Sequence, residues 1–219
     1  MKLRFIETGD RSKTLYHPEL NEHYHSTHGA YQESVHVYVK SGLDLFTDKS
    51  QIAVFEMGFG TGLNVLLAWL FAQEHKIDVN LTTLELYPLP EKIWQELDYY
   101  NNEKEKVVFT KLHSSTWEKE NKISSNFCLT KYKISLLEFE TEQKFDVLFF
   151  DAFGPDKQPD LWVIPVFEKL YSLLKLNGIL VTYSAKGQVR RNMQAAGFTV
   201  ERIPGPPGKR EMLRATRKE

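Results

Sequence analysis

Cysteine and long apolar runs are scarce in this sequence. Cys128 is the only cysteine among the 219 residues, which excludes an intramolecular disulfide framework and favours a reducing compartment. The longest apolar run, residues 65–72, is far too short to cross a bilayer, and the N-terminus has no apolar core of a secretory signal. We therefore expect a soluble, cytoplasmic protein without a membrane partner.

A strong net charge is also missing. The formal net charge is −1, so no overall positive field favours nucleic acid. Residues 184–219, however, hold nine Lys and Arg against three Glu, a net charge of +6. This segment suits a phosphate backbone, although a solvated face with a charged tail explains the same pattern. The residues that we single out for RNA binding are Lys186, Arg190, Arg191, Lys209 and Arg210, the last two in a loop rich in Pro and Gly.

Three glycines at alternate positions organise the chain. They follow an apolar run, residues 52–55, that ends in Glu56, and they precede an apolar-periodic segment, residues 63–74. This order predicts a strand, a tight turn and a helix. Glycines at such a junction permit positive φ and let backbone approach a ligand, while the N–H groups that open the helix are unpaired. We expect a nucleotide-type cofactor at Gly58, Gly60 and Gly62.

The glycine spacing distinguishes between nucleotide cofactors. Dinucleotide sites follow G-x-G-x-x-G, whereas this chain reads G-x-G-x-G directly after an acid, which disfavours a dehydrogenase. The pattern is similar to the first motif of class I S-adenosylmethionine-dependent methyltransferases. A second strand, residues 80–86, carries an acid that can accept hydrogen bonds from both hydroxyls of a ribose. The alternative is that the three glycines form an ordinary loop that binds no cofactor. The residues expected to bind S-adenosylmethionine are Glu56, Gly58, Phe59, Gly60, Thr61, Gly62, Asn64 and Glu85.

The rest of the pattern predicts a doubly wound α/β sheet over residues 51–219, the Rossmann-like class I methyltransferase fold. Residues 145–150 are nearly all apolar, as is typical of a parallel strand buried on both faces, and residues 178–183 repeat this pattern. Ligands of such sheets bind at the carboxyl ends of the strands. Helices are also predicted at 91–100, 162–175 and 187–196, strands at 127–139, 198–203 and 211–216, and irregular chain at 101–125.

Residues 1–50 are more than this fold needs, and we expect an N-terminal extension that caps the active site. Residues 3–8 and 14–16 alternate like the strands of a hairpin, and residues 32–43 have a helical pattern. The polar and aromatic segment between them suits a loop that closes over the cofactor, or a structural cap. Its histidines lack the partners of a zinc site, so no metal is expected at His23, His25 and His28.

Asp151 is the residue to which we assign the chemistry. Glu56, Glu85 and Asp151 each follow a predicted parallel strand, so they converge on one edge of the sheet. In Asp-Ala-Phe-Gly-Pro the acid precedes an aromatic residue and a proline, a variant of the Asp/Asn-Pro-Pro-Tyr arrangement of amine-methylating enzymes. We expect Asp151, Phe153 and Pro155 to be catalytic, and an Asp that merely opens a Gly-Pro turn is the alternative.

Methylation of an amine needs a free lone pair. An aliphatic amine with a pKa near 10 is only about 0.1% neutral at pH 7, a handicap of roughly 4 kcal/mol. A carboxylate alone would stabilise the ammonium form, so apolar neighbours such as Phe153 and Trp162, and the sulfonium cation of the donor, must oppose it. Asp151 would then orient the amine and accept a proton.

Several stretches together resemble one family. They are residues 25–33, 56–64, 151–162, 189–191 and 208–212. The similarity, over roughly residues 15–216, is to the methyltransferase half of the bifunctional bacterial enzyme that completes methylaminomethyl-(2-thio)uridine at the tRNA wobble position. The resemblance implies methyl transfer from S-adenosylmethionine to the primary amine of aminomethyluridine in the anticodon loop. It puts Asp151 at the catalytic position and adds Glu33 and Trp162 as substrate contacts.

Two features depart from that family. The bifunctional enzyme continues into a flavin-dependent oxidoreductase domain, whereas this sequence ends at Glu219, so we expect a stand-alone methyltransferase that binds no flavin and receives its amine by another route. The Asp that such enzymes use to contact adenine is not evident, and the candidates near the third strand are Lys131 and Glu138.

Three alternatives to this function stay open. They are methylation of a small amine or a protein, aminopropyl transfer as in spermidine synthase, and a non-catalytic RNA-binding module that senses the cofactor. No pattern in the sequence indicates an oligomeric state.

Overall fold

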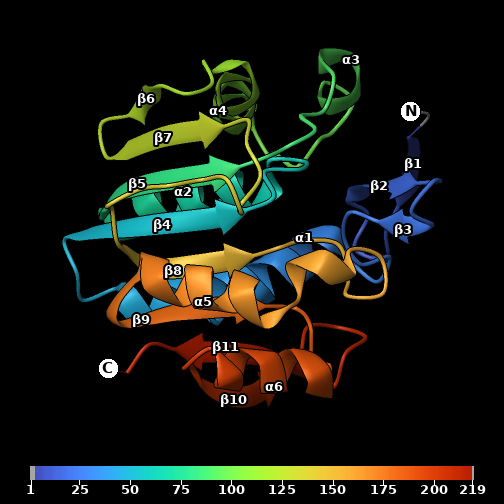
Figure 1. Ribbon diagram of the computed structural model, residues 1–219. Helices are drawn as coiled ribbons and strands as arrows, with labels where there is room; N and C mark the ends of the chain where they lie inside the picture. The colour runs from blue at the N-terminus through green and yellow to red at the C-terminus, as the bar shows by residue number, and fades with distance from the viewer. Residues whose placement is uncertain (1–2, 219) are drawn as a thin grey trace.

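One eight-stranded sheet with a parallel centre dominates the computed structural model, which describes residues 3–218. The strand order is β10-β11-β9-β8-β4-β5-β7-β6 (Figure 1). The parallel strands are β4 (Gln51–Met57), β5 (Asp78–Leu84), β7 (Phe127–Tyr132), β8 (Phe145–Phe150) and β9 (Leu174–Thr182). The antiparallel strands at the edges are β6 (Glu120–Ser124), β10 (Thr199–Pro204) and β11 (Glu211–Thr216).

Helices cover both faces of this sheet, so the predicted doubly wound α/β class is confirmed. Alternate residues of β8 point to opposite faces: Val147 and Phe149 belong to one apolar cluster, and Leu148 and Phe150 to the other. The first face carries α2 (Leu63–His75), α4 (Glu103–Ser114) and the π-helix η1 (Val35–Lys40), and the second carries α5 (Ile164–Leu173) and α6 (Gly187–Ala195).

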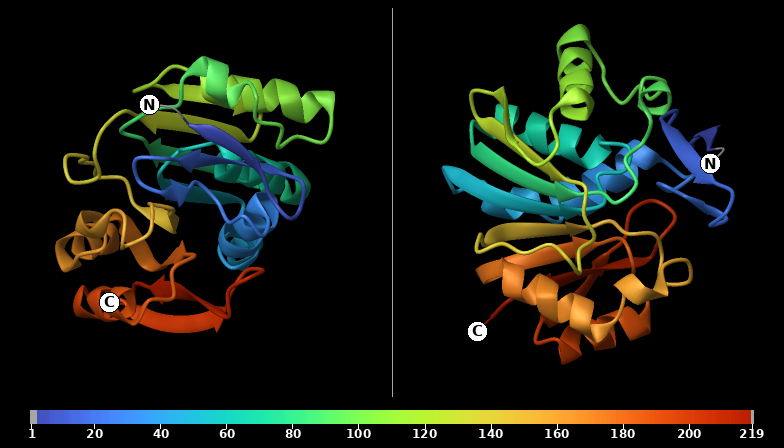
Figure 2. Two further views of the ribbon diagram at one scale, coloured as in Figure 1. Left: turned by 90° about the vertical axis from the view of Figure 1, so that its right-hand side faces the viewer. Right: turned by 45° about the horizontal axis from the view of Figure 1, so that its top comes forward.

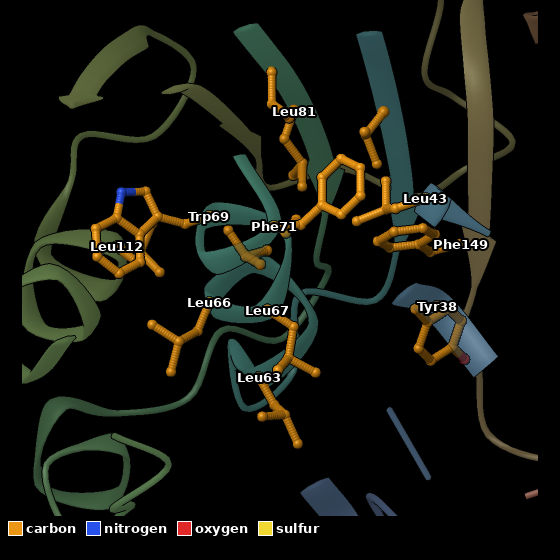
Figure 3. Packing of buried hydrophobic residues seen from close by; sticks show 14 of the residues in the cluster. Tyr38, Leu43, Leu63, Leu66, Leu67, Trp69, Phe71, Leu81, Leu112 and Phe149 are labelled. Carbon is orange, nitrogen blue, oxygen red and sulfur yellow. The ribbon is translucent and has the colours of Figure 1, made fainter. Parts of the chain in front are cut away.

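α2 is apolar around nearly its whole circumference because neighbours cover it on several sides. In Figure 3 Leu81 of β5, Leu112 of α4 and Tyr38 of η1 lie around it. Nine of its 13 residues are buried, and each large buried side chain contributes about 1.5–3 kcal/mol to folding. No helix within residues 3–218 combines the length and apolarity that a membrane span requires.

A second, three-stranded sheet lies across the carboxyl ends of the parallel strands (Figures 1 and 2). It consists of β1 (Arg4–Glu7), β2 (Lys13–His17) and β3 (Glu22–His23). The antiparallel pairing of β1 with β2 confirms the predicted hairpin.

The turn of this hairpin caps the helix that follows. Thr8 Oγ1, Ser12 Oγ and Asp10 Oδ2 accept hydrogen bonds from the first three N–H groups of α1 (Ala30–Ser34), at 3.3, 3.3 and 2.9 Å. These N–H groups have no partner inside the helix, so the turn satisfies them. The helix predicted at 32–43 therefore starts earlier, at Ala30, and it continues directly as the π-helix η1. After a turn at residues 41–42, the 3-10 helix η2 (Leu43–Phe46) follows.

Four sequence predictions of local structure were wrong. The strand predicted at 127–139 ends at Tyr132, the last residue of β7. The helix predicted at 91–100 is a single turn, α3 (Glu91–Trp94), and the segment read as irregular contains α4 and β6. The overlooked signal is a helix cap, because Asn102 Oδ1 accepts from Glu105 N–H at 3.0 Å and Asn102 Nδ2 donates to the Glu105 carboxylate. The strand predicted at 178–183 begins earlier, at Leu174 of β9, since α5 ends at Leu173.

Hydrogen bonds to the Asp146 carboxylate link the amino ends of three central strands, β4, β8 and β9. The Asp146 side chain is almost fully buried. Oδ1 accepts from Lys49 Nζ at 2.6 Å, and Oδ2 accepts from Lys175 Nζ at 2.8 Å and from the Ala53 N–H at 2.8 Å. Burial alone would raise the pKa of this carboxyl, but the three hydrogen bonds outweigh burial and lower it.

The variant D146A should lower the free energy of unfolding by about 2–3 kcal/mol, because it leaves the Ala53 N–H without an acceptor and removes the anion shared by two lysines. Urea denaturation measures this. E103A, which removes an exposed ion pair with Lys106, is the control and should cost less than about 0.5 kcal/mol. Equal losses in the two variants would contradict the role given to Asp146.

Candidate active site

A cavity of about 1220 Å³ opens at the carboxyl ends of the parallel strands. Its walls come from the turn between β4 and α2, the segments that follow β5, β7, β8 and β9, the N-terminal segment and the β10–β11 loop. The predicted site residues that line it are Glu33, Gly58, Phe59, Gly60, Thr61, Asn64, Glu85, Asp151, Phe153, Pro155, Lys186, Lys209 and Arg210. Those that do not line it are Glu56, Gly62, Trp162, Arg190 and Arg191.

The turn between β4 and α2 uses backbone that only glycine adopts easily. The φ angles of Gly58, Gly60 and Gly62 are +96°, +47° and +75°. A Cβ on Gly58 would lie 3.1 Å from the carbonyl oxygen of Asp151, so the two loops pack at backbone distance. Within residues 3–218 the N–H groups of Leu63 and Asn64, which open α2, have no acceptor. They are available to a ligand.

His113 of α4 packs against the backbone of this turn. Its Nε2–H donates to the Thr61 carbonyl at 3.1 Å, and its ring stacks on Trp94 with centroids 4.8 Å apart. A Cβ on Gly62 would meet Nε2 at 2.7 Å, which explains the third glycine. Burial lowers the pKa of His113 to about 3, so the imidazole is neutral.

Neither candidate for the adenine contact lines the cavity. Lys131 is buried, and its Nζ donates to the carbonyls of Leu112 and His113 at 2.8 and 2.7 Å. It therefore caps the C-terminus of α4, and burial lowers its pKa to about 8. Glu138 accepts a local hydrogen bond from Ser135. In that region the cavity is lined instead by Ile134, Ser135 and Leu136.

The two predicted cofactor carboxylates occupy different surroundings. Glu85 lines the cavity, where Oε2 accepts from the Gly60 N–H at 3.0 Å and Oε1 from the Tyr87 N–H at 2.9 Å. Glu56 belongs to β4 itself and is 0% exposed. Its Oε2 accepts from Thr83 Oγ1 at 2.6 Å, and burial raises its pKa to about 8.

Asp151 directly follows β8 and reaches into the cavity. Its Oδ2 accepts from Asn64 Nδ2 at 2.7 Å. Burial raises the pKa of Asp151, while His25, Tyr38 and Asn64 partly oppose that shift. Tyr38, on the π-helix, is buried, and its hydroxyl lies close enough to the Asp151 carboxylate to influence its pKa. The carboxylate thus sits among neutral donors and has raised basicity.

The N-terminal segment contacts the site through two polar links. His25 Nε2 lies 2.7 Å from Thr61 Oγ1 in the glycine turn. Glu33 Oε2 accepts from the Ser26 N–H at 2.7 Å, and its Oε1 accepts from Lys209 Nζ at 2.8 Å. Both side chains are buried, so these links join the segment to the turn and to the β10–β11 loop.

Aromatic residues hold the loop that follows Asp151. Trp162 Nε1 donates to the Phe153 carbonyl at 2.8 Å, and the Tyr183 hydroxyl donates to the Ala152 carbonyl at 2.9 Å. The Phe153 ring meets Tyr24 edge-on, with centroids 5.0 Å apart. Trp162 thus supports the loop from outside the cavity.

Two of the five positive charges predicted for RNA form ion pairs within the protein. Lys186 bonds Asp156, and Lys209 bonds Glu33 and lies 4.1 Å above the Tyr183 ring. Elsewhere in this segment Arg202 pairs with Glu211, Arg214 pairs with Glu201, and Arg217 donates to the carbonyl of Leu174. Arg191 donates to Gln188 on α6, and Arg190 is half-buried. Arg210 is exposed at the cavity and has no ion pair in the described chain.

The sequence analysis missed several side chains around the site. They come from segments remote from the glycine turn, and no local pattern marks them: Tyr24, Tyr38, His113 and Tyr183. His25 lay within a stretch that carried the family resemblance but was considered only as a metal ligand. Within residues 3–218 no cluster of metal-ligating side chains is present.

The neutral state of His113 predicts a loss of stability in acid. The unfolded chain binds a proton near pH 6.5 that the folded chain rejects down to about pH 3, so stability falls by about 1.4 kcal/mol for each pH unit below 6.5. Urea denaturation at several pH values should show this slope reduced in H113N. W94L removes the stacking partner and keeps the imidazole, so it should be less stable with the slope retained. An unchanged slope in H113N would contradict this assignment.

Comparisons with known proteins agree with this geometry. Residues 95–218 match the family model described as S-adenosyl-L-methionine-dependent methyltransferase. A protein of Campylobacter hominis named tRNA 5-methylaminomethyl-2-thiouridine biosynthesis bifunctional protein MnmC is 28% identical over 92% of this chain and 31% of its own length. Its namesake from Pseudomonas syringae pv. tomato is 30% identical over 90% of this chain and 32% of its own length. The chain thus spans about a third of these curated relatives.

Solved structures give the same fold. MNMC2 from Aquifex aeolicus superposes with a TM-score of 0.80 and 25% identity, over 99% of this chain and 71% of that chain. Spermidine synthase from Thermotoga maritima, at a TM-score of 0.58 and 11% identity over 99% and 72% of the two chains, shares the fold alone. With its glycine turn, its strand-end carboxylates and a family match over more than half its length, this chain belongs to the S-adenosyl-L-methionine-dependent methyltransferase family.

Proposed function

We propose that this protein transfers a methyl group from S-adenosylmethionine to the primary amine of 5-aminomethyl(-2-thio)uridine at the wobble position of tRNA. The observation that carries the proposal is Asp151, a carboxylate with a raised pKa in an aromatic cavity beside the glycine turn. The names of the Campylobacter and Pseudomonas relatives support the substrate. Such a substrate is cytoplasmic, and we expect the enzyme to act there.

The glycine turn fits the cofactor. Gly58 and Gly60 leave the backbone bare, and the free N–H groups of Leu63 and Asn64 point to a ligand with oxygen acceptors, such as the carboxylate of a methionine. Glu85 keeps lone pairs for ribose hydroxyls beyond its two backbone hydrogen bonds. Phe59 and Thr61 complete this wall, and residues 134–136 are the available adenine contacts. The bound cofactor supplies an electrophilic methyl group on a positively charged sulfur.

The other half of the cavity suits an amine. Asp151 orients its N–H groups by accepting hydrogen bonds, and the raised pKa makes it a better proton acceptor than an ordinary carboxylate. Phe153 and Tyr24 exclude water, which disfavours the ammonium form. Pro155 and the hydrogen bond from Trp162 keep the loop in place. Because both loops pack at backbone distance, an amine held by Asp151 would lie next to a cofactor held by the glycine turn.

Residues 1–50 act in this proposal as a cap over the site. His25 and Glu33 connect the cap to the cofactor turn and to the β10–β11 loop, so the cap contacts two walls of the cavity.

The proposal is tested by incorporation of labelled methyl groups from S-adenosylmethionine into two pools of tRNA. One pool carries aminomethyluridine at the wobble position, and the other lacks the aminomethyl group. Incorporation into the first pool alone is expected. Absence of incorporation from both pools, with the cofactor bound, would exclude the tRNA substrate and leave small amines and proteins.

The variant D151N should lower kcat by about 10²–10⁴-fold, because an amide orients the amine but accepts no proton. Cofactor affinity, measured calorimetrically, should change by less than about threefold, since the affinity depends on the glycine turn and Glu85. D78N, an exposed acid at the opposite edge of the sheet, is the control with unchanged kcat. Wild-type turnover in D151N would assign the chemistry elsewhere.

Arg210 is an exposed cation at the cavity without an ion pair in the described chain, so R210A should weaken tRNA binding and reduce the slope of log affinity against log salt by about one. Filter binding at several salt concentrations measures both. K144A is the matched control, because Lys144 lies at the other end of β8 and donates to the Ser172 carbonyl. If both variants reduce the slope equally, RNA does not bind at the cavity mouth.

A further inference from the structure

Glu56 differs from the other acids near the site because it does not line the cavity. It is 0% exposed and is the penultimate residue of β4, just before the glycine turn. One oxygen, Oε2, accepts the hydrogen bond from Thr83. The other, Oε1, is buried and has no hydrogen-bond partner in the described part of the chain. If Glu56 were ionised, the burial of this charged oxygen without a hydrogen-bond donor would cost free energy of folding.

Asn64 also has a buried acceptor oxygen that receives no hydrogen bond in the described chain. It is 3% exposed, and its Nδ2 donates to Asp151 Oδ2 at 2.7 Å. Its Oδ1 is buried without a partner among residues 3–218. The Asn64 amide also lies close enough to the Glu56 carboxyl to interact with it. Both side chains therefore hold a buried acceptor that has no donor in the described part of the chain.

We propose that Glu56 is a positioning residue, a buried neutral acid whose Oε1–H donates to Asn64 Oδ1 and so keeps the Asn64 amino group on Asp151. The chain of donors then runs in one direction, from Thr83 to Glu56, from Glu56 to Asn64 and from Asn64 to Asp151. Glu56 was expected from the sequence to contact the cofactor, and this role replaces that one. It rests on the proposed function in that Asp151 is taken as the group that meets the amine.

The surroundings of Glu56 favour its neutral form. Burial raises its pKa to about 8, the Asp151 and Glu85 carboxylates add to the shift, and the hydrogen bond from Thr83 and the nearby Asn64 amide oppose it. The groups that face Asp151 are His25 and Glu33 of the N-terminal segment and Tyr38 of the π-helix.

Ionisation of Glu56 would make the side-chain amide of Asn64 rotate, so that its nitrogen and oxygen exchange places. A charged Glu56 attracts the amino group of Asn64, and rotation of the amide then turns its oxygen toward Asp151. Two oxygens that repel each other would face across the former hydrogen bond, and Asp151 would lose its fixed orientation. Turnover should therefore fall as pH rises through about 8 while cofactor binding persists.

The test compares E56Q, E56L and V54A with the wild type on tRNA carrying aminomethyluridine, from about pH 7 to about pH 9.5. Gln supplies a permanent donor to Asn64 and cannot ionise, so the ratio of kcat in E56Q to that of the wild type should rise about tenfold per unit above pH 8. Because both enzymes share one substrate, ionisation of the amine cancels in this ratio. E56L should lower kcat at least about tenfold with cofactor affinity within about threefold. V54A, a truncation on the same strand, controls for general destabilisation and should keep the wild-type pH profile.

A pH-independent ratio would overturn the proposal, as would an E56L variant that loses cofactor affinity and keeps kcat. An inactive wild type on this tRNA would instead contradict the proposed function. The infrared spectrum separates the two cases without any substrate, since the wild type at neutral pH should show the carbonyl band of a buried protonated carboxyl that E56Q lacks. Absence of that band would overturn the assignment of Glu56.

Discussion

The close approach of two backbone segments, the turn after β4 and the loop after β8, is the constraint on which the site depends. The Asp151 N–H donates to the Met57 carbonyl at 3.2 Å, and a Cβ on Gly58 would lie 3.1 Å from the Asp151 carbonyl oxygen. Because β4 and β8 are neighbouring parallel strands, the sheet itself sets this distance. Parallel strands buried on both faces keep it rigid, and their packing rests on the alternating apolar residues of β8. Cofactor and amine thereby share one cavity.

Burial, more than charge pairing, sets the electrostatics of the cavity. Burial raises the pKa of Asp151 and Glu56 and lowers that of His25 and His113, so in each case it favours the neutral form of the group. Among the acids there, Glu33 pairs with Lys209 and Asp156 pairs with Lys186, and the first pair joins the cap to the β10–β11 loop. A site with few compensating cations attracts an amine and a sulfonium while its aromatic walls limit hydration. Both properties suit methyl transfer to nitrogen.

The sequence predicted the parts of the site that depend on local chain geometry. The glycine turn, the strand-end acids and the buried strand β8 were recognisable because glycine spacing and apolar runs restrict backbone directly. Tyr38 and His113 were not predictable, since a π-helix and a helix from the misread segment 101–125 bring them to the site through tertiary packing. Counting Lys and Arg overstated the basic face, because Lys186 and Lys209 have acidic partners far away in sequence. Glu56 was assigned to the cofactor from its motif, whereas its burial removes it from the cavity.

The most direct test of this account is a crystal structure of the protein with S-adenosylhomocysteine and an anticodon stem-loop that carries aminomethyluridine. The account predicts the adenosyl ribose at Glu85, the amino acid part of the cofactor at the N-terminus of α2, and the amine nitrogen about 3 Å from a carboxylate oxygen of Asp151. An amine bound away from Asp151, or a nucleoside away from the glycine turn, would contradict it.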